Sequence, residues 1–272
     1  MTTSFTDTSL ELLEHVLVCP TSRAPLRRQG STLRCEATSR DYPVRADWID
    51  FLPDSGSHGI GPALMHLPIV ARVYEGYWRP TFVTLGSGEA SDLERELGWV
   101  ERELEVARGQ VIADVSCGPG TIGRRLAKTK MFAQVVMVDY AEAMLTQCAR
   151  LARDEHLDGM VLVRADVRYL PFADGALGGV HAGYALHMWE SPEQGLSEIA
   201  RSLRPGGVLV GSTVVRPQGW LSGMISDAAS RASRVTTFEP DLLRNMLADV
   251  GLVDFRAQVS RTLIRFRAQK PG

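Results

Sequence analysis

From residue 91 onward, short apolar runs alternate with segments whose apolar positions recur at helical spacing. The apolar runs predict strands, and the amphipathic segments predict helices. The predicted strands are Val111–Val115, Gln134–Val138, Met160–Arg164, Gly178–Ala182 and Val208–Thr213. The predicted helices are Ser91–Ala107, Thr121–Thr129, Ala141–Glu155 and Pro192–Leu203. Because strands and helices alternate, we expect a parallel sheet with right-handed crossovers.

The C-terminal pattern differs, because two strand-like runs follow a helix with no further helix between them. The helix is predicted over Pro240–Val250, and the two runs are Val253–Val259 and Thr262–Ala268. Two consecutive strands with a tight link form an antiparallel hairpin, which we place at an edge of the sheet. Residues 91–272 are therefore expected to form a doubly wound α/β domain with a seven-stranded sheet. Its first helix is expected to begin at a capping box, Ser91 with Glu94.

The first 53 residues contain only short, turn-rich patterns. A helix is predicted over Ser9–Val16, whereas Thr32–Cys35 and Asp41–Val44 predict strands of a small ribbon. Residues 1–53 are therefore expected to form a separate N-terminal module.

Residues 54–90 join this module to the α/β domain. They begin with a Gly/Ser/His linker, Asp54–Gly61, and continue as a helical segment that we expect to be interrupted at Pro68 and Pro80. The turn Gly86–Gly88 is expected to end this segment. Its aromatic residues are Tyr74, Tyr77, Trp78 and Phe82. An aromatic-rich helix in this position is expected to form a lid over the domain.

Composition limits the classes of protein that are possible. The 272 residues suit one α/β domain with a small additional module, and the formal net charge of −2 gives no general attraction to nucleic acid or acidic membranes. Met1–Glu14 lacks the features of a secretory signal, and no apolar run approaches the ~20 residues of a membrane-spanning helix. We therefore expect a cytoplasmic protein with no membrane partner. Its four cysteines, expected to be free thiols, are Cys19, Cys35, Cys117 and Cys148.

The strongest chemical signal is the run Val111–Gly120, in which an apolar strand ends in a glycine-containing turn. Small residues in such a turn let the backbone approach a ligand at the C-terminal edge of the strand. The turn also fits the G-x-G-x-x-G pattern of nicotinamide enzymes through Gly118, Gly120 and Gly123. Taken alone, this turn is weak evidence for either kind of cofactor.

Acidic residues at the ends of later strands make the signal more specific. Asp139 ends the second predicted strand, where its carboxylate can accept both hydroxyls of a ribose. Asp166 ends the third, where it can accept a hydrogen bond from the exocyclic amine of adenine. Asp166 and the turn Leu203–Gly207, which leads into the fifth strand, have no counterpart in the dinucleotide fingerprint. They argue against a nicotinamide cofactor.

This ordered set resembles the class I S-adenosylmethionine (SAM) dependent methyltransferases over about two thirds of the chain. The resemblance implies a Rossmann-like methyltransferase fold, SAM as the cofactor, S-adenosylhomocysteine as the product and no metal. It assigns these residues to the cofactor: Asp114, Ser116, Gly118, Gly120, Asp139, Tyr140, Asp166 and Val167. By this resemblance Gly118 and Gly120 make room for the methionine part, and Asp114 orients their loop. The first glycine of the usual family loop is Ser116 here.

The N-terminal module resembles a zinc ribbon that has lost half of its ligands. Cys19 and Cys35 remain, whereas Ser22 and Ser39 are poor zinc ligands. A ribbon in front of a class I domain resembles the ribosomal RNA guanine-N1 methyltransferases, which keep their ligands. It is more similar to a group of plant-plastid and bacterial methyltransferases of the type 11 group. The segments that carry the second resemblance are Val161–Phe172, His181–Pro192 and Glu198–Gly207.

The acceptor is expected beyond the C-terminal ends of the strands, where the strand order reverses. His187 is the first candidate for a general base, because its unperturbed pKa lies near neutrality, and Tyr184 is the second. His187 could instead only shape the pocket through hydrogen bonds. The residues expected to contact the acceptor are Tyr74, Tyr77, Trp78, His181, Trp189 and Trp220.

The sequence thus predicts methyl transfer from SAM to an oxygen or carbon of a small, largely apolar metabolite of secondary metabolism, similar to an isoprenoid, quinone or polyketide. The alternative is a ribosomal RNA base methyltransferase, because the N-terminal module carries more arginines than the rest. These arginines are Arg23, Arg27, Arg28, Arg34, Arg40 and Arg45. A third possibility is a binding protein that retains SAM without turnover. A homo-oligomer is compatible with the sequence.

Overall fold

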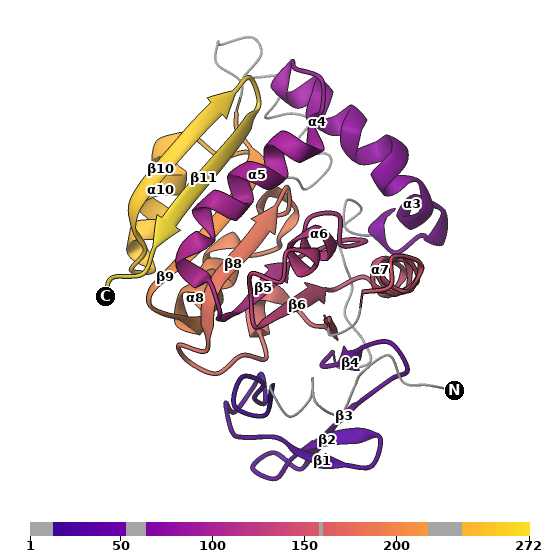
Figure 1. Cartoon of the computed structure of the whole chain (residues 1–272). Helices are drawn as coiled ribbons and strands as arrows, with labels where there is room; N and C mark the ends of the chain where they lie inside the picture. Colours follow the sequence, from indigo (N-terminus) through magenta and orange to yellow (C-terminus); the bar gives the residue numbers. More distant parts are fainter. Residues whose placement is uncertain (1–12, 53–63, 158–159, 217–235) are drawn as a thin grey trace.

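The computed structural model describes residues 13–52, 64–157, 160–216 and 236–272, which form a mainly parallel sheet with helices on both faces (Figure 1). The strand order is β10-β11-β9-β8-β5-β6-β7-β4, in which β11 runs antiparallel to both of its neighbours, β10 and β9, and all other neighbouring strands pair in parallel. The strands are β4 (Ile49–Asp50), β5 (Val111–Val115), β6 (Gln134–Asp139), β7 (Val161–Arg164), β8 (Leu177–Gly183), β9 (Leu203–Val214), β10 (Val253–Ser260) and β11 (Leu263–Gln269). The predicted C-terminal hairpin is confirmed, with β11 pairing to β9.

The strand order reverses between β5 and β8. From β5 the chain proceeds through β6 and β7 in one direction, and then returns to β8 and β9 on the other side of β5. Crossovers that leave a parallel sheet in opposite directions open a crevice at the strand carboxyl ends. Ligands are therefore expected beyond Val115 and Gly183, the last residues of β5 and β8.

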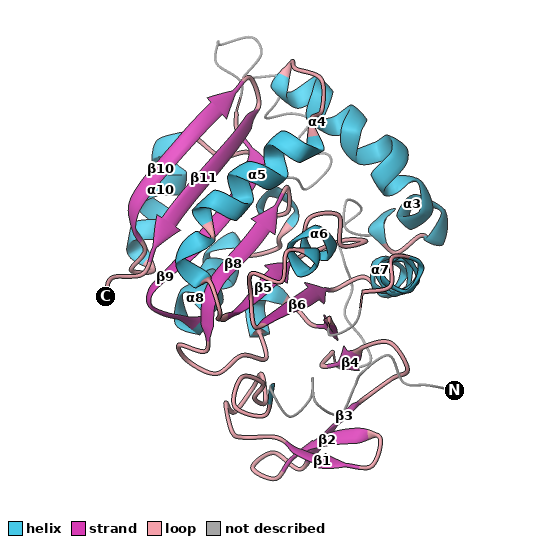
Figure 2. Ribbon diagram, in the orientation of Figure 1, coloured by secondary structure: helices cyan, strands magenta, loops and turns pink. Residues whose placement is uncertain are grey.

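Helices cover both faces of the sheet, because successive strand residues point to opposite sides (Figure 2). In β6, for example, Val135 and Met137 belong to one buried cluster, whereas Val136 and Val138 belong to the other. The first cluster packs against α5 (Leu93–Glu103), α6 (Gly123–Lys128) and α7 (Glu142–Asp154). The second packs against α8 (Pro192–Ser202) and α10 (Pro240–Asp249). A strand buried on both faces is apolar at nearly every position, which explains the runs seen in the sequence.

The capping box predicted for the first helix of the domain was placed one residue too early. The side chain of Asp92, not Ser91, caps α5, because its Oδ1 accepts a hydrogen bond of 3.0 Å from the amide of Arg95. An aspartate is also a strong N-cap, since its carboxylate complements the positive end of the helix.

The segment before the domain is helical on both sides of one break. Leu64 and Met65 are helical, the chain leaves the helix at His66 and Leu67, and α3 (Pro68–Val73) begins at Pro68, so the expected interruption at Pro68 is confirmed. From Pro68 the helix is continuous through the π-helical turn η1 (Tyr74–Trp78) and α4 (Arg79–Ser87), and Gly88 ends it in a left-handed conformation. The expected interruption at Pro80 was wrong, because the chain accommodates this proline next to the π turn.

The N-terminal module contains the predicted ribbon and also extends the main sheet. β1 (Arg27–Gln29), β2 (Thr32–Cys35) and β3 (Arg40–Pro43) form an antiparallel ribbon, whereas β4 pairs in parallel with β7. The sheet therefore has eight strands among the described residues, not the seven expected. A two-residue strand whose partner lies more than a hundred residues away leaves no periodic signal. Most of the predicted Ser9–Val16 helix lies outside the described residues.

Hydroxyl groups surround the two ribbon cysteines. Cys19 Sγ lies 3.2 Å from the hydroxyl of Tyr42 and 3.8 Å from that of Thr38, and Cys35 Sγ lies 3.5 Å from that of Ser22. Thr38, rather than the expected Ser39, therefore faces the cysteine. The described residues contain no group of three or more His, Cys, Asp or Glu side chains arranged to hold a metal ion. All four cysteines are free.

Candidate active site

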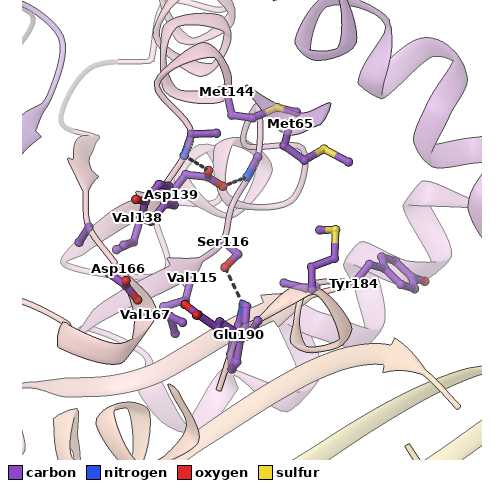
Figure 3. A pocket seen from close by; sticks show the side chains of 18 of the residues that line it. Met65, Val115, Ser116, Val138, Asp139, Met144, Asp166, Val167, Tyr184 and Glu190 are labelled. Atoms are coloured by element: carbon purple, nitrogen blue, oxygen red, sulfur yellow. Dashed lines mark hydrogen bonds between the residues drawn. The ribbon is translucent and has the colours of Figure 1, made fainter. Parts of the chain in front are cut away.

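A cavity of about 390 Å³ opens at the carboxyl ends of β5, β6, β7 and β8 (Figure 3). Its volume lies in the range of small-molecule sites. Six of the eight residues predicted to bind the cofactor line it: Ser116, Gly118, Asp139, Tyr140, Asp166 and Val167. The fold thus brings together residues from three separate strand ends, as the sequence pattern predicted.

The loop after β5 adopts left-handed backbone conformations that normally require glycine. Gly118 and Ser116 both have φ of 57°. A serine in this conformation is strained by ~1–2 kcal/mol, and the indole of Trp189 holds it by donating a 3.0 Å hydrogen bond to Ser116 Oγ (Figure 3). This bond explains how a serine is accommodated where the family usually has glycine.

Gly120 serves the packing of this loop and does not line the cavity. A Cβ atom at Gly120 would lie 2.6 Å from Cys148 Sγ and 2.9 Å from Met137 Cε. The absent side chain therefore lets helix α7 and strand β6 approach the loop. The expectation that Gly120 makes room for the cofactor is replaced by a role in packing beneath it.

Asp139 is held at the end of β6 by two backbone amides (Figure 3). Gly118 donates a hydrogen bond of 2.7 Å to one carboxylate oxygen, and Ala141 donates one of 2.8 Å to the other. Burial raises the pKa of Asp139 to about 6, although these amide hydrogens partly oppose the rise. A carboxylate has about four acceptor sites, so each oxygen can accept a further bond from a ribose hydroxyl.

Asp114 and His181 form a buried pair beneath the loop. Asp114 accepts a 3.0 Å hydrogen bond from the amide of Gly123, and its other oxygen lies 2.7 Å from His181 Nδ1. Asp114 thus connects β5 with the start of α6 and with β8. His181 was expected to contact the acceptor, but the structure turns its ring toward Asp114 and away from the main cavity.

Asp166 lines the cavity while bound to a neighbouring arginine. Its carboxylate accepts hydrogen bonds from the amide of Arg168 at 2.9 Å and from the guanidinium at 2.7 Å. Arg168 also pairs with Glu190 at the cavity rim. Asp166, Arg168 and Glu190 therefore form one charged wall.

The N-terminal module bonds to the chain segment that follows Asp166 and Arg168. Val18 donates a hydrogen bond to the carbonyl of Pro171, and Arg23 forms a two-pronged ion pair with Glu198 at 2.7 and 2.8 Å. Glu198 in turn accepts a 2.9 Å hydrogen bond from the amide of Leu170. The module thus contacts the segment that immediately follows Asp166.

The π turn decides which lid residues reach the cavity. In an α-helix, residues three and four positions apart share a face, so a regular helix would place Tyr77 and Trp78 on the same side as Tyr74. The π turn instead places Arg79, five residues on, beneath Tyr74, and the amide of Arg79 bonds to the carbonyl of Tyr74. Tyr74 lines the cavity, whereas Tyr77 (77% exposed) and Trp78 (43% exposed) point outward. The expected acceptor contacts of Tyr77 and Trp78 were therefore wrong.

The expected position of His187 at the cavity mouth is corrected by the structure. β8 ends at Gly183, and the short turn η4 (Leu186–Met188) points Met188 into the cavity and His187 toward β9. His187 is buried, its ring stacks on Phe82, and its Nδ1 lies 3.3 Å from the hydroxyl of Thr213. Burial lowers the pKa of His187 to about 4, so the ring is neutral at pH 7.

Tyr184 lines the cavity but points its hydroxyl group away from it (Figure 3). Its ring packs edge-on against Phe82, and the guanidinium of Arg79 lies 5.4 Å from the ring centre. Arg79 is itself buried in a 2.7 Å ion pair with Glu96. Tyr184 therefore forms part of the wall, rather than presenting a hydroxyl group to the reaction.

A second, much smaller cavity of about 20 Å³ adjoins the first behind Ser116. It is lined by the pairs Arg79–Glu96 and Asp114–His181 and by Thr121, whose buried hydroxyl makes no hydrogen bond in the described structure. A buried polar atom without a partner is costly and is usually completed by water or ligand. This chamber is therefore suited to a small polar group.

Sequence reasoning missed several residues that line the cavity. Met65 and His66 precede the lid helix, Met144 lies on α7, and Met188 follows β8. Only Met188 had a signal, because it stands between two residues that were singled out. Trp189, by contrast, lines the cavity as expected, and Trp220 lies outside the described residues.

Comparison with known proteins agrees with this geometry. A family model described as a methyltransferase domain matches residues 113–211. An uncharacterized chloroplastic methyltransferase of Arabidopsis thaliana is 31% identical over 278 residues, covering 94% of this chain and 78% of the relative. A second chloroplastic methyltransferase of this plant is 36% identical over 68% of this chain and 54% of the relative. A demethylmenaquinone methyltransferase of Desulfitobacterium hafniense is 28% identical over 44% of this chain and 49% of the relative.

Solved structures share the fold. Phosphoethanolamine N-methyltransferase 2 of Haemonchus contortus, in complex with SAM, superposes with a TM-score of 0.64 at 15% identity, over 86% of this chain and 62% of that one. The strand order, the glycine turn and the acidic strand ends define the class I methyltransferase fold. The chain belongs to the SAM-dependent methyltransferase family, and SAM is its cofactor.

These findings correct the expected location. The expected cytoplasmic location was wrong, because both Arabidopsis relatives are chloroplastic proteins and the relationship points away from the cytoplasm. Among the described residues, no helix combines the length and the apolar character needed to span a bilayer.

Proposed function

We propose that the enzyme transfers the methyl group of SAM to an oxygen or carbon of a small, largely apolar acceptor of the isoprenoid, quinone or polyketide kind. The observation that carries this proposal is the apolar part of the cavity lining. Met65, Met144 and Met188 line the cavity together with the aromatic residues Tyr74 and Trp189. Thioether side chains adapt to irregular apolar shapes. A relative that methylates demethylmenaquinone supports a quinone-like acceptor.

The charges of the cavity also favour an acceptor without a phosphate group. Among the described residues, Arg168 is the only lysine or arginine that lines it. Both the guanidinium bonds to Asp166 and the pairing with Glu190 already engage this side chain. A phosphate group on the acceptor could pair with Arg168 only if the ion pairs of Arg168 with Asp166 and Glu190 were broken.

The cavity residues fit SAM in a definite orientation. Asp139 offers carboxylate acceptors to the ribose, and Asp166 offers them to the adenine amine. We infer that the methionine end points past Ser116 toward the small chamber, where Thr121 has an unused hydroxyl. Bound SAM supplies an electrophilic methyl group, and no metal is needed for its displacement.

The protein then positions the acceptor and excludes water. Burial raises the pKa of Tyr74 to about 12, so its phenol stays neutral while its ring covers the loop at Gly118. Among the described residues, His66 is the only histidine that lines the cavity, where its ring meets Tyr140 edge-on. We assign to His66, rather than to the buried His187, the proton that the acceptor releases.

Methyl-labelled SAM, incubated with a metabolite extract, tests this proposal. We expect label in a product that partitions into organic solvent, and His66→Ala should slow its formation by roughly 10²-fold without changing SAM affinity. His156→Ala, a change of an exposed histidine with left-handed backbone outside the cavity, is the control. Label that enters only RNA or water-soluble products would contradict the proposed acceptor class.

The RNA alternative receives less support from the structure. Three of the six arginines in the N-terminal module are already used in ion pairs: Arg23 with Glu198, Arg34 with Asp41 and Arg45 with Asp50. The affinity of a protein for RNA comes largely from lysines and arginines that displace counterions from the phosphates. An arginine that is already held in an ion pair contributes less to this binding. The basic character of the module therefore belongs in part to its own fold.

A further inference from the structure

The outward side of the lid helix is unusually apolar. Half of the twelve exposed large apolar side chains in the described part of the chain lie between residues 67 and 85. We call this surface the outer stripe, and its residues are Leu67, Ile69, Val73, Tyr77, Trp78 and Leu85. A surface helix of a globular protein normally turns polar residues outward. This one turns apolar residues outward and needs an explanation.

The geometry of the helix gathers these side chains along one side. Ile69, Val73 and Tyr77 follow one another at four-residue spacing, which places them above one another on a helix. Ile69, Tyr77 and Leu85 are 63%, 77% and 74% exposed. α3 and α4 lie at the outer rim of the molecule (Figure 1). The outer stripe is therefore open to a partner that is itself broad and apolar.

Charge narrows the choice of partner. Between residues 64 and 87 the charged side chains are Arg72, Glu75 and Arg79. Glu75 pairs with Arg124, and Arg79 is buried against Glu96. Arg72 alone is exposed, so the outward face carries a cation and no exposed carboxylate. Apolar side chains with tyrosine, tryptophan and a basic residue are typical of helices that lie in a membrane interface.

The inward side of the same segment belongs to the active site. Met65, His66 and Tyr74 line the cavity, while Ala71 and Val83 are buried against the domain. One helix thus separates the cavity from the outer stripe by its own thickness. An apolar molecule that leaves a lipid layer at this helix would reach the cavity over a short path with little contact with water.

We propose that the outer stripe docks the enzyme on an anionic lipid surface, from which the acceptor enters the cavity. The purpose of this docking rests on the proposed apolar acceptor, whereas the docking itself can be measured without one. The earlier expectation of no membrane partner was based on net charge and on spanning segments. A helix that lies on the surface needs neither a long apolar run nor a basic protein.

The test uses the full chain and vesicles of phosphatidylcholine with or without phosphatidylglycerol, separated by flotation. We expect the protein to float with vesicles, more strongly when the anionic lipid is present. Ile69→Ser with Tyr77→Ser should weaken this binding by roughly tenfold or more, because two exposed apolar side chains are removed. The control is Leu242→Ser with Val259→Ser, two apolar side chains on α10 and β10 that are 49% and 46% exposed.

Three results would overturn the docking proposal. The first is wild-type protein that binds S-adenosylhomocysteine but floats with neither kind of vesicle. The second is equal vesicle binding by the Ile69/Tyr77 variant and the control variant. The third is a wild-type protein that is a dimer in solution while the Ile69/Tyr77 variant is a monomer, since a second copy of the chain would then cover the outer stripe. Turnover of a detergent-dispersed acceptor separates the two proposals. This turnover should be retained in the Ile69/Tyr77 variant, because detergent delivers the acceptor without a membrane. If wild-type protein shows no such turnover, the result counts against the proposed acceptor class and not against the docking.

Discussion

Replacement of Asp139 by asparagine should separate cofactor affinity from fold stability. The raised pKa means that the native protein holds this buried carboxylate at a cost of about 3 kcal/mol near pH 7. Asparagine removes that cost. It also leaves one of the two amides, from Gly118 or Ala141, without an acceptor, which costs ~1–3 kcal/mol. The two effects oppose each other, so the free energy of unfolding should rise by no more than about 2 kcal/mol.

Cofactor affinity should fall much more than stability. The carboxylate of Asp139 is the acceptor that faces the ribose, and hydrogen bonds to a charged group contribute ~1.5–3 kcal/mol each. Loss of one or two such bonds predicts a dissociation constant for S-adenosylhomocysteine that is roughly 10- to 100-fold higher. Calorimetry at pH 7.5 measures this change. Asp241→Asn, at an exposed acid on α10, is the control.

The same residue predicts a pH dependence with a definite sign. Its folded-state pKa lies above the ordinary value, so the proton is favoured by the fold and stability from this group is lost as pH rises through about 6. Ribose binding needs the carboxylate, so affinity should instead fall as pH drops below about 6, by up to about tenfold per unit. Asp139→Asn should abolish this dependence. Wild-type affinity that is flat between pH 5 and 8, or a variant that binds within about threefold of wild type, would refute the assignment.

Three further changes test other parts of the site. Ser116→Gly should keep cofactor binding, because glycine adopts the left-handed conformation freely, whereas Ser116→Val should lose about 1–3 kcal/mol of stability in thermal unfolding. Arg23→Ala should lower the free energy of unfolding by about 1 kcal/mol and weaken S-adenosylhomocysteine binding severalfold in calorimetry. The reason is that Glu198, the partner of Arg23, bonds to the amide of Leu170 in the segment after Asp166. Unchanged binding would argue against this role of the N-terminal module. His187→Ala should destabilise the fold by about 2 kcal/mol but leave kcat of the folded variant nearly unchanged. A drop of roughly 10²-fold or more in a folded variant would restore its role as base.

The parallel strands and the acidic strand ends could be predicted from the sequence because their signals are local. A strand buried on both faces is apolar at nearly every position, and Asp114 in β5 is the exception because it pairs with His181. The carboxyl ends of neighbouring parallel strands lie at the same edge of the sheet. Val111–Val115 was therefore found without error, and Asp139 and Asp166 were correctly placed beside one cavity.

The remaining details depend on backbone geometry that the sequence pattern does not carry. The π turn moved Trp78 outward, and the turn η4 rotated His187 away from the cavity. β4 has only two residues, and its pairing with Val163 depends on contacts across the whole domain. The small chamber beside Thr121 is lined by residues from η1, α4, α5, β5 and β8, so no single segment signals it.

The contacts between the N-terminal module and β7 have a consequence for how the chain folds as it is synthesised. Leu17 bridges to Phe172, and Ile49 pairs with Val163, so the N-terminal module is synthesised before its partners, which lie more than a hundred residues later in the chain. Such non-local pairing is slow, because the long intervening chain must be ordered first. Until then β7 is an open sheet edge, a surface on which other chains can pair. The module thus leaves the ribosome before β7 but can pair with it only afterwards, and this pairing closes the edge of the sheet.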